Sequence, residues 1–445
     1  MKDIKVGLIG LGTVGTGVAK VLLQQGDMLE HKLGARLTLK RIADLDLKTD
    51  RGIKIPAGVM TANVEDILSD PEISIVIELI GGIEPAKTFI ETALARGKHV
   101  VTANKKLLAE CGKEIYQAAN KNNADLLFEA SVAGGIPVIR ALKEGLAANR
   151  IHYIGGILNG TCNFILTKMT EEGGDFQTVL KEAQDLGYAE ADPTLDIEGH
   201  DTAHKVAILC SLSQGAYVNL SDIHTEGITR VTPLDVQLAR DLGYRIKLLG
   251  IIRNLDGEIE ARVHPTMIPE DHILSSVRGA FNALQIVGDN VGNILLYGLG
   301  AGMMPTASAV VGDVIELARG IRSGARGRVP ELACWPEYMS HKKIKPMENI
   351  VTPYYFRFTA LDRPGVLSTI AGILGDHNIS IESVIQKGRG EVGAVPIVMM
   401  THEAREADAR QALERIDKLD VIPEKTMLIR VENRDPVAMA GGGEC

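Results

Sequence analysis

Short apolar runs alternate with segments of helical periodicity over the first 135 residues. The runs occupy residues 4–9, 37–43, 73–80, 99–102 and 126–128, and residues 13–25 and 85–96 are examples of the periodic segments. Strands that are apolar on both faces and alternate with helices are typical of βαβ units. The pattern therefore predicts an α/β domain over residues 1–135, built on a doubly wound, mostly parallel sheet.

From about residue 136 the pattern changes, and the predicted strands and helices no longer alternate regularly. The pattern predicts strands at 151–158 and 293–297, helices at 175–186 and 200–213, a strand pair around residues 254–257, and a helix opening at Pro305. Asn159-Gly160-Thr161 has the composition of a turn, with Thr161 as the N-cap of a helix. We expect an α+β domain over residues 136–330 that binds substrate, supports dimerisation and returns to the first domain.

Residues 331–353 are polar and contain Pro336, Pro346 and Pro353, which is typical of a linker. Beyond them the pattern predicts strand 354–360, helix 365–377, strands 379–386 and 392–400, helix 404–419 and strand 421–431. This β-α-β-β-α-β order is typical of a ferredoxin-like sandwich, which we place at residues 350–432.

Composition narrows the class of protein. The chain has 445 residues, of which 45% are hydrophobic and 24% charged, as in ordinary globular proteins, and its formal net charge is −9. We expect no nucleic-acid partner because such partners demand clustered Lys and Arg, and no membrane partner because no apolar run approaches about 20 residues. The five cysteines are scattered, with no metal-binding spacing, so we expect a cytoplasmic location.

Gly10-Leu-Gly-Thr13-Val14-Gly15 directly follows the first apolar run and opens a helix. Gly10 permits a tight turn, Gly12 lets the backbone approach a pyrophosphate, and Gly15 lets the helix pack on the strand. The helix N-terminus then favours the negative phosphates. GxGxxG alone is a weak motif, but its place in a βαβ unit at residue 10 predicts a Rossmann-type dinucleotide site.

The residues around the second strand leave the choice of cofactor open. Asp44 at its end suits a ribose 2′-hydroxyl and favours NAD, whereas Arg41 and Arg51 suit the 2′-phosphate of NADP. Both cofactors remain expectations at this point.

Two lysines stand out near strand ends and acidic residues. Lys105 follows the strand 99–102, at the sheet edge where ligands collect, although most lysines are simply solvated. Asp201 and Lys205 are four residues apart, so a helix from His200 puts them on one face that continues with apolar residues. A buried charged pair is either a structural ion pair or functional.

Hydride transfer to an aldehyde is the chemistry that these lysines suit. Negative charge grows on the carbonyl oxygen, and a nearby ammonium can stabilise that charge and deliver a proton. A desolvated lysine beside a second lysine has its pKa pulled toward neutrality.

Several motifs together resemble those of homoserine dehydrogenase. They are Gly10–Gly15, Thr102-Ala-Asn-Lys105, the segment 156–164, Tyr188-Ala-Glu190, the segment 199–205, and Gly300-Ala-Gly302 with the Met-Met-Pro-Thr306 that follows. The match spans roughly the first 320 residues, in the order and spacing of the family. The resemblance implies reversible hydride transfer between NAD(P)H and L-aspartate 4-semialdehyde, giving L-homoserine in threonine and methionine biosynthesis.

The same resemblance implies roles for individual residues. Lys205 would be the general acid/base with Lys105 beside the reacting carbon, and Thr102 and Gly302 would approach the cofactor. Substrate would be bound or oriented by Glu190, Asp196, Asp201, Gly160 and Thr161. Glu129, with the carbonyl groups of Val132, Gly134 and Ile136, would hold a structural monovalent, sodium-like cation, which takes oxygen ligands.

The C-terminal segments 360–367 and 377–383 resemble a regulatory ACT domain. The resemblance implies pairing between subunits, with a homodimer or homotetramer as the expected assembly. It also implies that a free amino acid, with threonine the natural candidate, binds near Asp362, Gly365, Asn378 and Ile379. A degenerate domain that only dimerises is the alternative.

Two other functions compete with this interpretation. A semialdehyde dehydrogenase needs a thiolate nucleophile, for which Cys162 at a helix start is the candidate, although a buried filler cysteine fits as well. A non-catalytic sensor that controls transcription would need a basic DNA-reading helix, which this acidic chain does not display.

Overall fold

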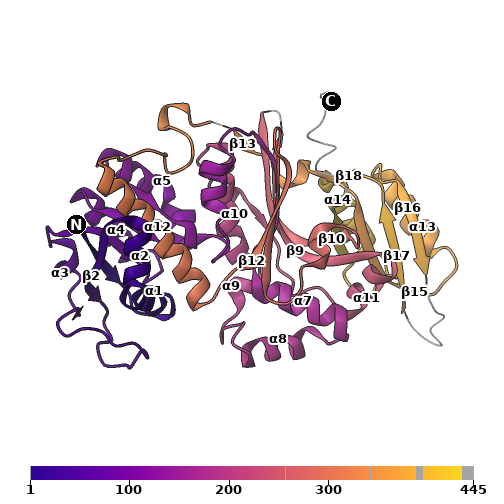
Figure 1. Ribbon diagram of the computed structural model, residues 1–445. Helices are drawn as coiled ribbons and strands as arrows, with labels where there is room; N and C mark the ends of the chain where they lie inside the picture. The colour runs from indigo at the N-terminus through magenta and orange to yellow at the C-terminus, as the bar shows by residue number, and fades with distance from the viewer. Residues whose placement is uncertain (1, 256, 341, 387–393, 433–445) are drawn as a thin grey trace.

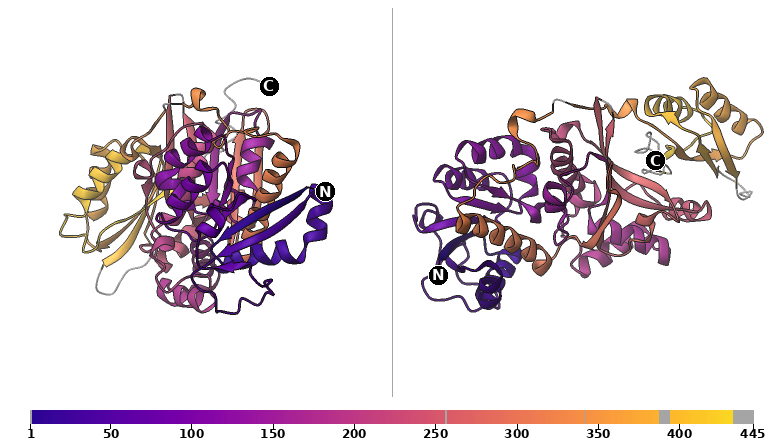
Figure 2. Two further views of the ribbon diagram at one scale, coloured as in Figure 1. Left: turned by 90° about the vertical axis from the view of Figure 1, so that its left-hand side faces the viewer. Right: turned by 45° about the horizontal axis from the view of Figure 1, so that its top comes forward.

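A computed structural model describes residues 2–255, 257–340, 342–386 and 394–432, and shows three units in a row (Figures 1 and 2). The N-terminal unit lies at one end, a central unit carries the long strands, and the C-terminal unit lies at the other end. No helix among these residues is long and apolar enough to span a membrane. Cys111, Cys162, Cys210 and Cys334 are free thiols, and Cys445 lies outside the described residues.

The N-terminal unit is the predicted doubly wound parallel sheet. Its strand order is β3-β2-β1-β4-β5-β6, the order of a Rossmann fold. The strands are β1 (Asp3–Ile9), β2 (Arg36–Ala43), β3 (Met60–Thr61), β4 (Ile73–Glu78), β5 (His99–Thr102) and β6 (Leu126–Leu127). The helices between them are α1 (Thr13–Gln24), α2 (Gly26–Leu33), α3 (Glu65–Leu68), α4 (Ala86–Ala95) and α5 (Lys105–Lys121).

Helix α12 (Met303–Ser323) returns from the central unit to pack against α1, as Figure 1 shows. The contact is close, because a Cβ added to Gly17 would lie 2.9 Å from the Met303 carbonyl oxygen and 3.0 Å from the Ala307 Cβ. Buried Val310, Val311 and Val314 complete the apolar layer. The N-terminal unit is therefore completed by a helix that the chain supplies only after most of the central unit.

An 11-stranded sheet runs through the central and C-terminal units, in the main order β12-β11-β7-β9-β10-β19-β15-β17-β16. Its central strands are β7 (Ile151–Ile157), β8 (His224–Thr225), β9 (Tyr244–Leu255), β10 (Glu258–Pro269), β11 (Phe281–Gly288) and β12 (Gly292–Leu299). The helices around them are α6 (Val138–Arg140), α7 (Gly160–Glu172), α8 (Phe176–Asp185), α9 (Thr194–Ile197), α10 (His200–Gln214) and α11 (Pro233–Asp241).

The C-terminal unit has the predicted ferredoxin-like arrangement, with strands in the order β19-β15-β17-β16. Its elements are β15 (Tyr354–Leu361), α13 (Val366–Asp376), β16 (Ile381–Gln386), β17 (Ala394–Thr401), α14 (Glu406–Ile416) and β19 (Met427–Val431), with the small pair β14 (Val351–Thr352) and β18 (Ala404–Arg405). Strand β19 also pairs in parallel with β10, where Thr266 faces Arg430, so the two units share one sheet.

Two local predictions were wrong. The N-cap of α7 is Asn159, whose side chain accepts a hydrogen bond from the Cys162 amide, whereas Thr161 lies inside the helix. The segment 331–353 is not a bare linker, because β13 (Lys343–Ile344) pairs with β10 and β14 pairs with β18. The first error arose because Asn159 and Thr161 are both residue types that cap helices, and the second because a short polar segment carries little periodicity and is ordered by distant partners.

Candidate active site

The glycine-rich loop lies between β1 and α1, at the carboxyl end of the sheet. Gly10 adopts φ +95°, and a Cβ on Gly15 would lie 2.1 Å from the Gly10 carbonyl oxygen, so both positions require glycine. Space is open above Gly12, and no side chain caps the first turn of α1. The free amide groups of this turn fit a dinucleotide pyrophosphate.

Asp44, at the end of β2, faces this loop. One carboxylate oxygen accepts a hydrogen bond from the Leu11 amide at 2.5 Å, and the other lies 3.9 Å from Arg51. Arg51 also pairs with Asp46 at 3.1 Å. Arg41 instead donates to the carbonyl oxygens of its neighbour Lys40 and of Gly58. The structure thus brings Asp44 to the loop and directs Arg41 elsewhere.

A buried carboxylate, Glu78, organises the ends of β4 and β5. It accepts hydrogen bonds from the Thr102 hydroxyl at 2.7 Å and from the amides of Ile80 and Gly81 at 2.8 and 3.1 Å. Asn104 caps α5 and donates to the Gly82 carbonyl oxygen at 2.7 Å. These bonds shape the loop beside Lys105. Sequence analysis missed Glu78, although a charged residue closing an apolar run is itself a signal.

Asp201 joins the two lysines. Its carboxylate lies 2.8 Å from the Lys105 Nζ through one oxygen and 2.7 Å from the Lys205 Nζ through the other. Lys205 also donates to the Leu158 carbonyl oxygen at 2.6 Å. Lys105 comes from the N-terminal unit, whereas Asp201 and Lys205 are on α10, so this cluster lies where the two units meet.

The two lysines differ in exposure and in pKa. The Lys205 side chain is 9% exposed, and its burial lowers its pKa, which Lys105 lowers further while Asp201 opposes the shift. The Lys105 side chain is 43% exposed, and the attraction of Asp201 outweighs the effect of burial and raises its pKa. Of these two lysines, only Lys205 shows the predicted lowering of its pKa.

Asn159 extends the cluster toward Asp196. Its amide donates to Asp201 at 2.8 Å and to Asp196 at 2.7 Å, and the Thr161 hydroxyl donates to the other Asp196 oxygen at 3.2 Å. Burial, followed by repulsion from Asp201, raises the pKa of Asp196. Glu190 lies in an exposed loop, and its charge contributes to the raised pKa of Lys105. Asn159 is a second residue that sequence analysis missed.

Two predicted glycines have different surroundings. Gly160 packs on the loop before β11, because an added Cβ would lie 2.7 Å from the Ala280 carbonyl oxygen. Gly302 adopts φ +112° at the start of α12, with open space around most of its position. Gly302 is therefore accessible and precedes Met303, which packs on Gly17 of α1, whereas Gly160 must be small because it packs closely on Ala280.

Comparison with known proteins decides the family. Family models described as "Homoserine dehydrogenase", "Homoserine dehydrogenase, NAD binding domain" and "ACT domain" match residues 137–315, 10–129 and 354–421. Homoserine dehydrogenases of Neisseria gonorrhoeae and Pseudomonas aeruginosa are each 46% identical to this chain, over 97% of it and 99% of their own length. The chain belongs to the homoserine dehydrogenase family.

Solved structures agree with this assignment. The crystal structure of a homoserine dehydrogenase from Thiobacillus denitrificans superposes with a TM-score of 0.92 at 48% identity, covering 97% of this chain and 99% of that one. A hyperthermophilic archaeal homoserine dehydrogenase in complex with NADPH has a TM-score of 0.61 at 29% identity, covering 71% of this chain and 97% of that one. As a family member, the chain is an NAD(P)-dependent oxidoreductase with a C-terminal ACT domain.

The surroundings of Cys162 argue against a thiolate mechanism in this homoserine dehydrogenase family member. Its burial, reinforced by Asp196 and Asp201, raises the pKa of the thiol well above its usual value. The Sγ atom donates to the Asp196 carbonyl oxygen at 3.1 Å. A neutral, buried thiol is a poor nucleophile, so the role of Cys162 is to pack beside Asp196 and Asp201.

Proposed function

We propose that the chain interconverts L-homoserine and L-aspartate 4-semialdehyde, with Lys205 as general acid/base. The observation that carries this proposal is the cluster Lys105–Asp201–Lys205 at the meeting of two units, one of which carries the dinucleotide loop. A bound nicotinamide cofactor takes up or supplies the hydride. In reduction, the Lys205 ammonium stabilises the developing alkoxide and donates its proton; in oxidation, the neutral amine accepts that proton.

The remaining residues would bind and orient the substrate. Asp196 and Glu190 offer carboxylates for the substrate ammonium, and Asp201 holds both lysines in place. Lys105, the more exposed lysine, would face the reacting carbon and the cofactor. In this proposal residues 1–135 bind the cofactor, residues 136–330 bind the substrate and form the dimer contact, and residues 350–432 regulate activity.

The cofactor contacts are proposed for the glycine-rich loop, Asp44, Thr102 and Gly302. Both NAD and NADP remain candidates, because Asp44 suits a ribose hydroxyl while Arg51, close to it, suits a 2′-phosphate. Arg41 would first have to release the two backbone carbonyl groups to which its guanidinium donates before it could bind a 2′-phosphate.

A monovalent cation is proposed for the loop of residues 129–136. Glu129 is 5% exposed, and burial raises its pKa, although it accepts hydrogen bonds from the amides of Ile139 and Arg140. Ala133 and Gly134 both have positive φ and so bend the backbone sharply. One carboxylate and the carbonyl groups of Val132, Gly134 and Ile136 are oxygen ligands suited to such an ion, which would stabilise the loop.

Threonine is the proposed effector of the C-terminal unit. Gly365 begins α13 without a side-chain cap, so free amide groups there suit the carboxylate of an amino acid. Asp362 is exposed, whereas Asn378 adopts φ 59° in an exposed turn. Ile379 is 3% exposed, so only its backbone would contact the ligand.

The proposed function is tested by following the reduction of NAD and of NADP in the presence of L-homoserine. Lys205→Ala should lower kcat by about 10²–10⁴-fold, because the variant lacks the proton acceptor. Lys106→Ala, which changes an exposed lysine beside Lys105, is the matched control. Cofactor binding, measured by fluorescence titration, should survive in both variants. Turnover of Lys205→Ala close to that of the wild type would refute the role assigned to Lys205.

A further inference from the structure

The short segment 224–228 lies between helix α10, which carries Asp201 and Lys205, and the C-terminal unit. Its first part is β8, which pairs in parallel with β10, and the Glu226 amide donates to the Val263 carbonyl oxygen at 2.8 Å. These bonds fix the segment to the long strands of the central unit.

The same segment packs tightly on the α9–α10 link, by which we mean residues 196–201. The Ile228 amide donates to the Ile197 carbonyl oxygen at 2.8 Å. A Cβ on Gly227 would lie 2.2 Å from that oxygen, and a Cβ on Gly199 would lie 3.1 Å from the Glu226 carbonyl oxygen. The link carries Asp196 and Asp201 and has no spare space against the segment.

The Glu226 side chain points the other way, to two arginines of the C-terminal unit. Arg430 donates to both carboxylate oxygens, at 2.9 and 3.0 Å, and Arg410 donates at 2.6 Å. His224 lies 2.9 Å away. Burial alone would raise the pKa of Glu226, but the hydrogen bonds from His224 and Arg430 lower it, so the carboxylate stays charged.

The arginines are themselves held firmly. Arg430 is 1% exposed and bonds both oxygens of Glu406, which also accepts from the Tyr354 hydroxyl at 3.0 Å. Arg410 donates to Glu406 at 2.9 Å. A bidentate pair between rigid groups fixes geometry as well as charge.

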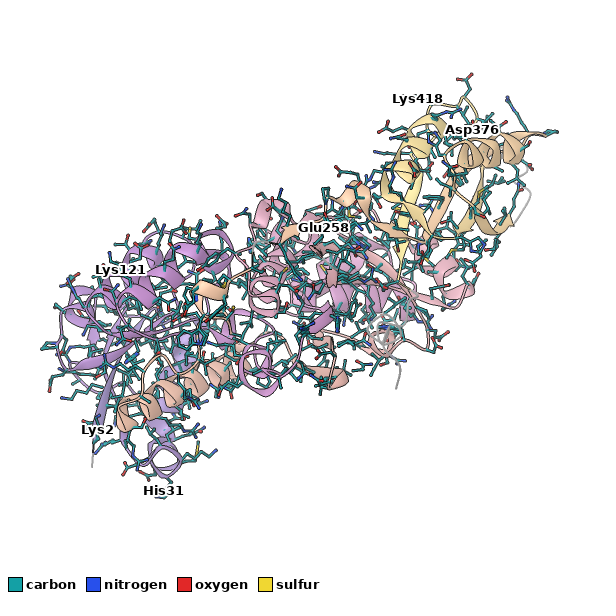
Figure 3. The ribbon with its side chains drawn as sticks, turned by 90° about the horizontal axis from the view of Figure 1, so that it is seen from above. Lys2, His31, Lys121, Glu258, Asp376 and Lys418 are labelled. Atoms are coloured by element: carbon teal, nitrogen blue, oxygen red, sulfur yellow. The ribbon has the colours of Figure 1, made fainter. Side chains whose placement is uncertain are left out.

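Helix α14 connects this contact with the far tip of the C-terminal unit. Glu406 and Arg410 are in its first turns, whereas Arg415, in its last turn, lies 3.3 Å from Asp376 and from the His377 ring. Figure 3 shows Asp376 and Lys418 together at that tip, away from Glu258 in the central unit. The tip adjoins Asn378, in the region proposed for the effector.

We propose that Glu226 is a positioning residue. Through Glu226 the C-terminal unit fixes the position of the α9–α10 link. The link in turn positions Asp196, which is assigned to substrate binding, and Asp201, which holds the two lysines. The inference rests on the proposed function, since it assigns those carboxylates to substrate binding. Without the anchor at Arg430 and Arg410, the segment 224–228 shifts, and because it packs without gaps on the link, the link shifts with it. The C-terminal unit then controls substrate affinity through one carboxylate.

The test compares Glu226→Gln with the wild type in steady-state oxidation of homoserine. The KM for homoserine should rise about three- to tenfold, while the KM for the dinucleotide, which binds a different unit, stays within about twofold. Glu226→Asp, which keeps the charge, should recover part of the loss. Asp408→Asn, which breaks an ion pair of 2.9 Å with Arg405 at the start of α14, is the control and should leave both constants unchanged.

A second variant keeps the inference testable if Glu226→Gln fails to fold. Arg410→Ala removes a side chain that is 48% exposed, so its fold should survive, and it should also raise the KM for homoserine selectively. An unchanged KM for homoserine in a folded variant, or an equal rise for both substrates, overturns the inference. A wild type without homoserine-dependent turnover would instead refute the proposed function.

Discussion

At the scale of single residues, Asp201 decides how the two lysines behave. It is 5% exposed and stays ionised because Lys205 and Lys105 lower its pKa more than burial raises it. In turn it raises the pKa of both lysines, and only the more deeply buried Lys205 shows a net fall. One carboxylate thus keeps Lys105 charged while burial moves Lys205 toward the range useful for proton transfer.

Asp201→Asn should move the pH dependence of homoserine oxidation to lower pH. Oxidation needs neutral Lys205, so its rate rises as pH passes upward through the Lys205 pKa, which already lies below 10.5. Removing Asp201 removes a charge that raises this pKa, so the midpoint falls while the maximal kcat decreases through lost positioning. The profile of kcat against pH measures both effects, and an unchanged midpoint would contradict the coupling.

Whether a site residue could be predicted depended on how far along the chain its interaction partner lies. Asp201 and Lys205 could be paired from the sequence because four residues span one helical turn. Lys105 could be placed at a sheet edge, but not beside Asp201, since nothing local joins residues 96 positions apart. Asn159 escaped notice because an amide in a turn looks the same whether it caps a helix, which it does, or also bridges two carboxylates.

At the scale of elements, the loop between β12 and α12 packs against a residue that shares a hydrogen-bond acceptor with Lys205. Gly300 packs against Asn282, whose amide donates at 3.0 Å to the Leu158 carbonyl oxygen, and this oxygen also accepts from Lys205. A Cβ on Gly300 would lie 2.0 Å from the Asn282 Nδ2. Asn282 is 1% exposed and therefore has little room to move.

Gly300→Ala should accordingly lower kcat by about tenfold or more, because displacing Asn282 disturbs the carbonyl group that holds Lys205. Gly312→Ala, on α12 with nothing within 4 Å of the added Cβ, is the matched control and should retain activity. Turnover measured at saturating homoserine and cofactor distinguishes the two variants. Equal turnover would show that the loop tolerates a side chain and does not support Lys205.

At the scale of the whole molecule, the C-terminal unit is built into the central sheet. Strand β19 lies beside β10, and Glu432, just after it, pairs with Arg253 and lies 3.6 Å from Arg262. These arginine side chains are 7% and 1% exposed, and Glu260 is their partner within the central unit, 3.3 Å from Arg253. The sequence suggested instead a separate domain that follows a linker at residues 331–353.

Removing the residues after 349 should therefore destabilise the remaining chain as well as abolish control by the effector. The truncation removes the ion pairs of Glu432 with Arg253 and Arg262 and uncovers strand β10, which pairs with β19, so the melting temperature and the turnover should both fall. Deleting only residues 433–445 keeps Glu432 and is the control. A shortened chain with the melting temperature and turnover of the wild type would contradict this account, and one still inhibited by threonine would place the effector site elsewhere.

The sequence by itself determined the elements and the kind of chemistry. The periodicities of the Rossmann and ferredoxin-like units, the glycine-rich turn and the spacing of Asp201 and Lys205 depend on the backbone within a few residues, and local patterns encode them directly. Tertiary structure alone decided that Lys105 meets Asp201 and that β19 joins β10. Backbone pairing at a strand edge uses groups that every residue carries, and a buried ion pair needs partners from distant segments, so neither leaves a local trace.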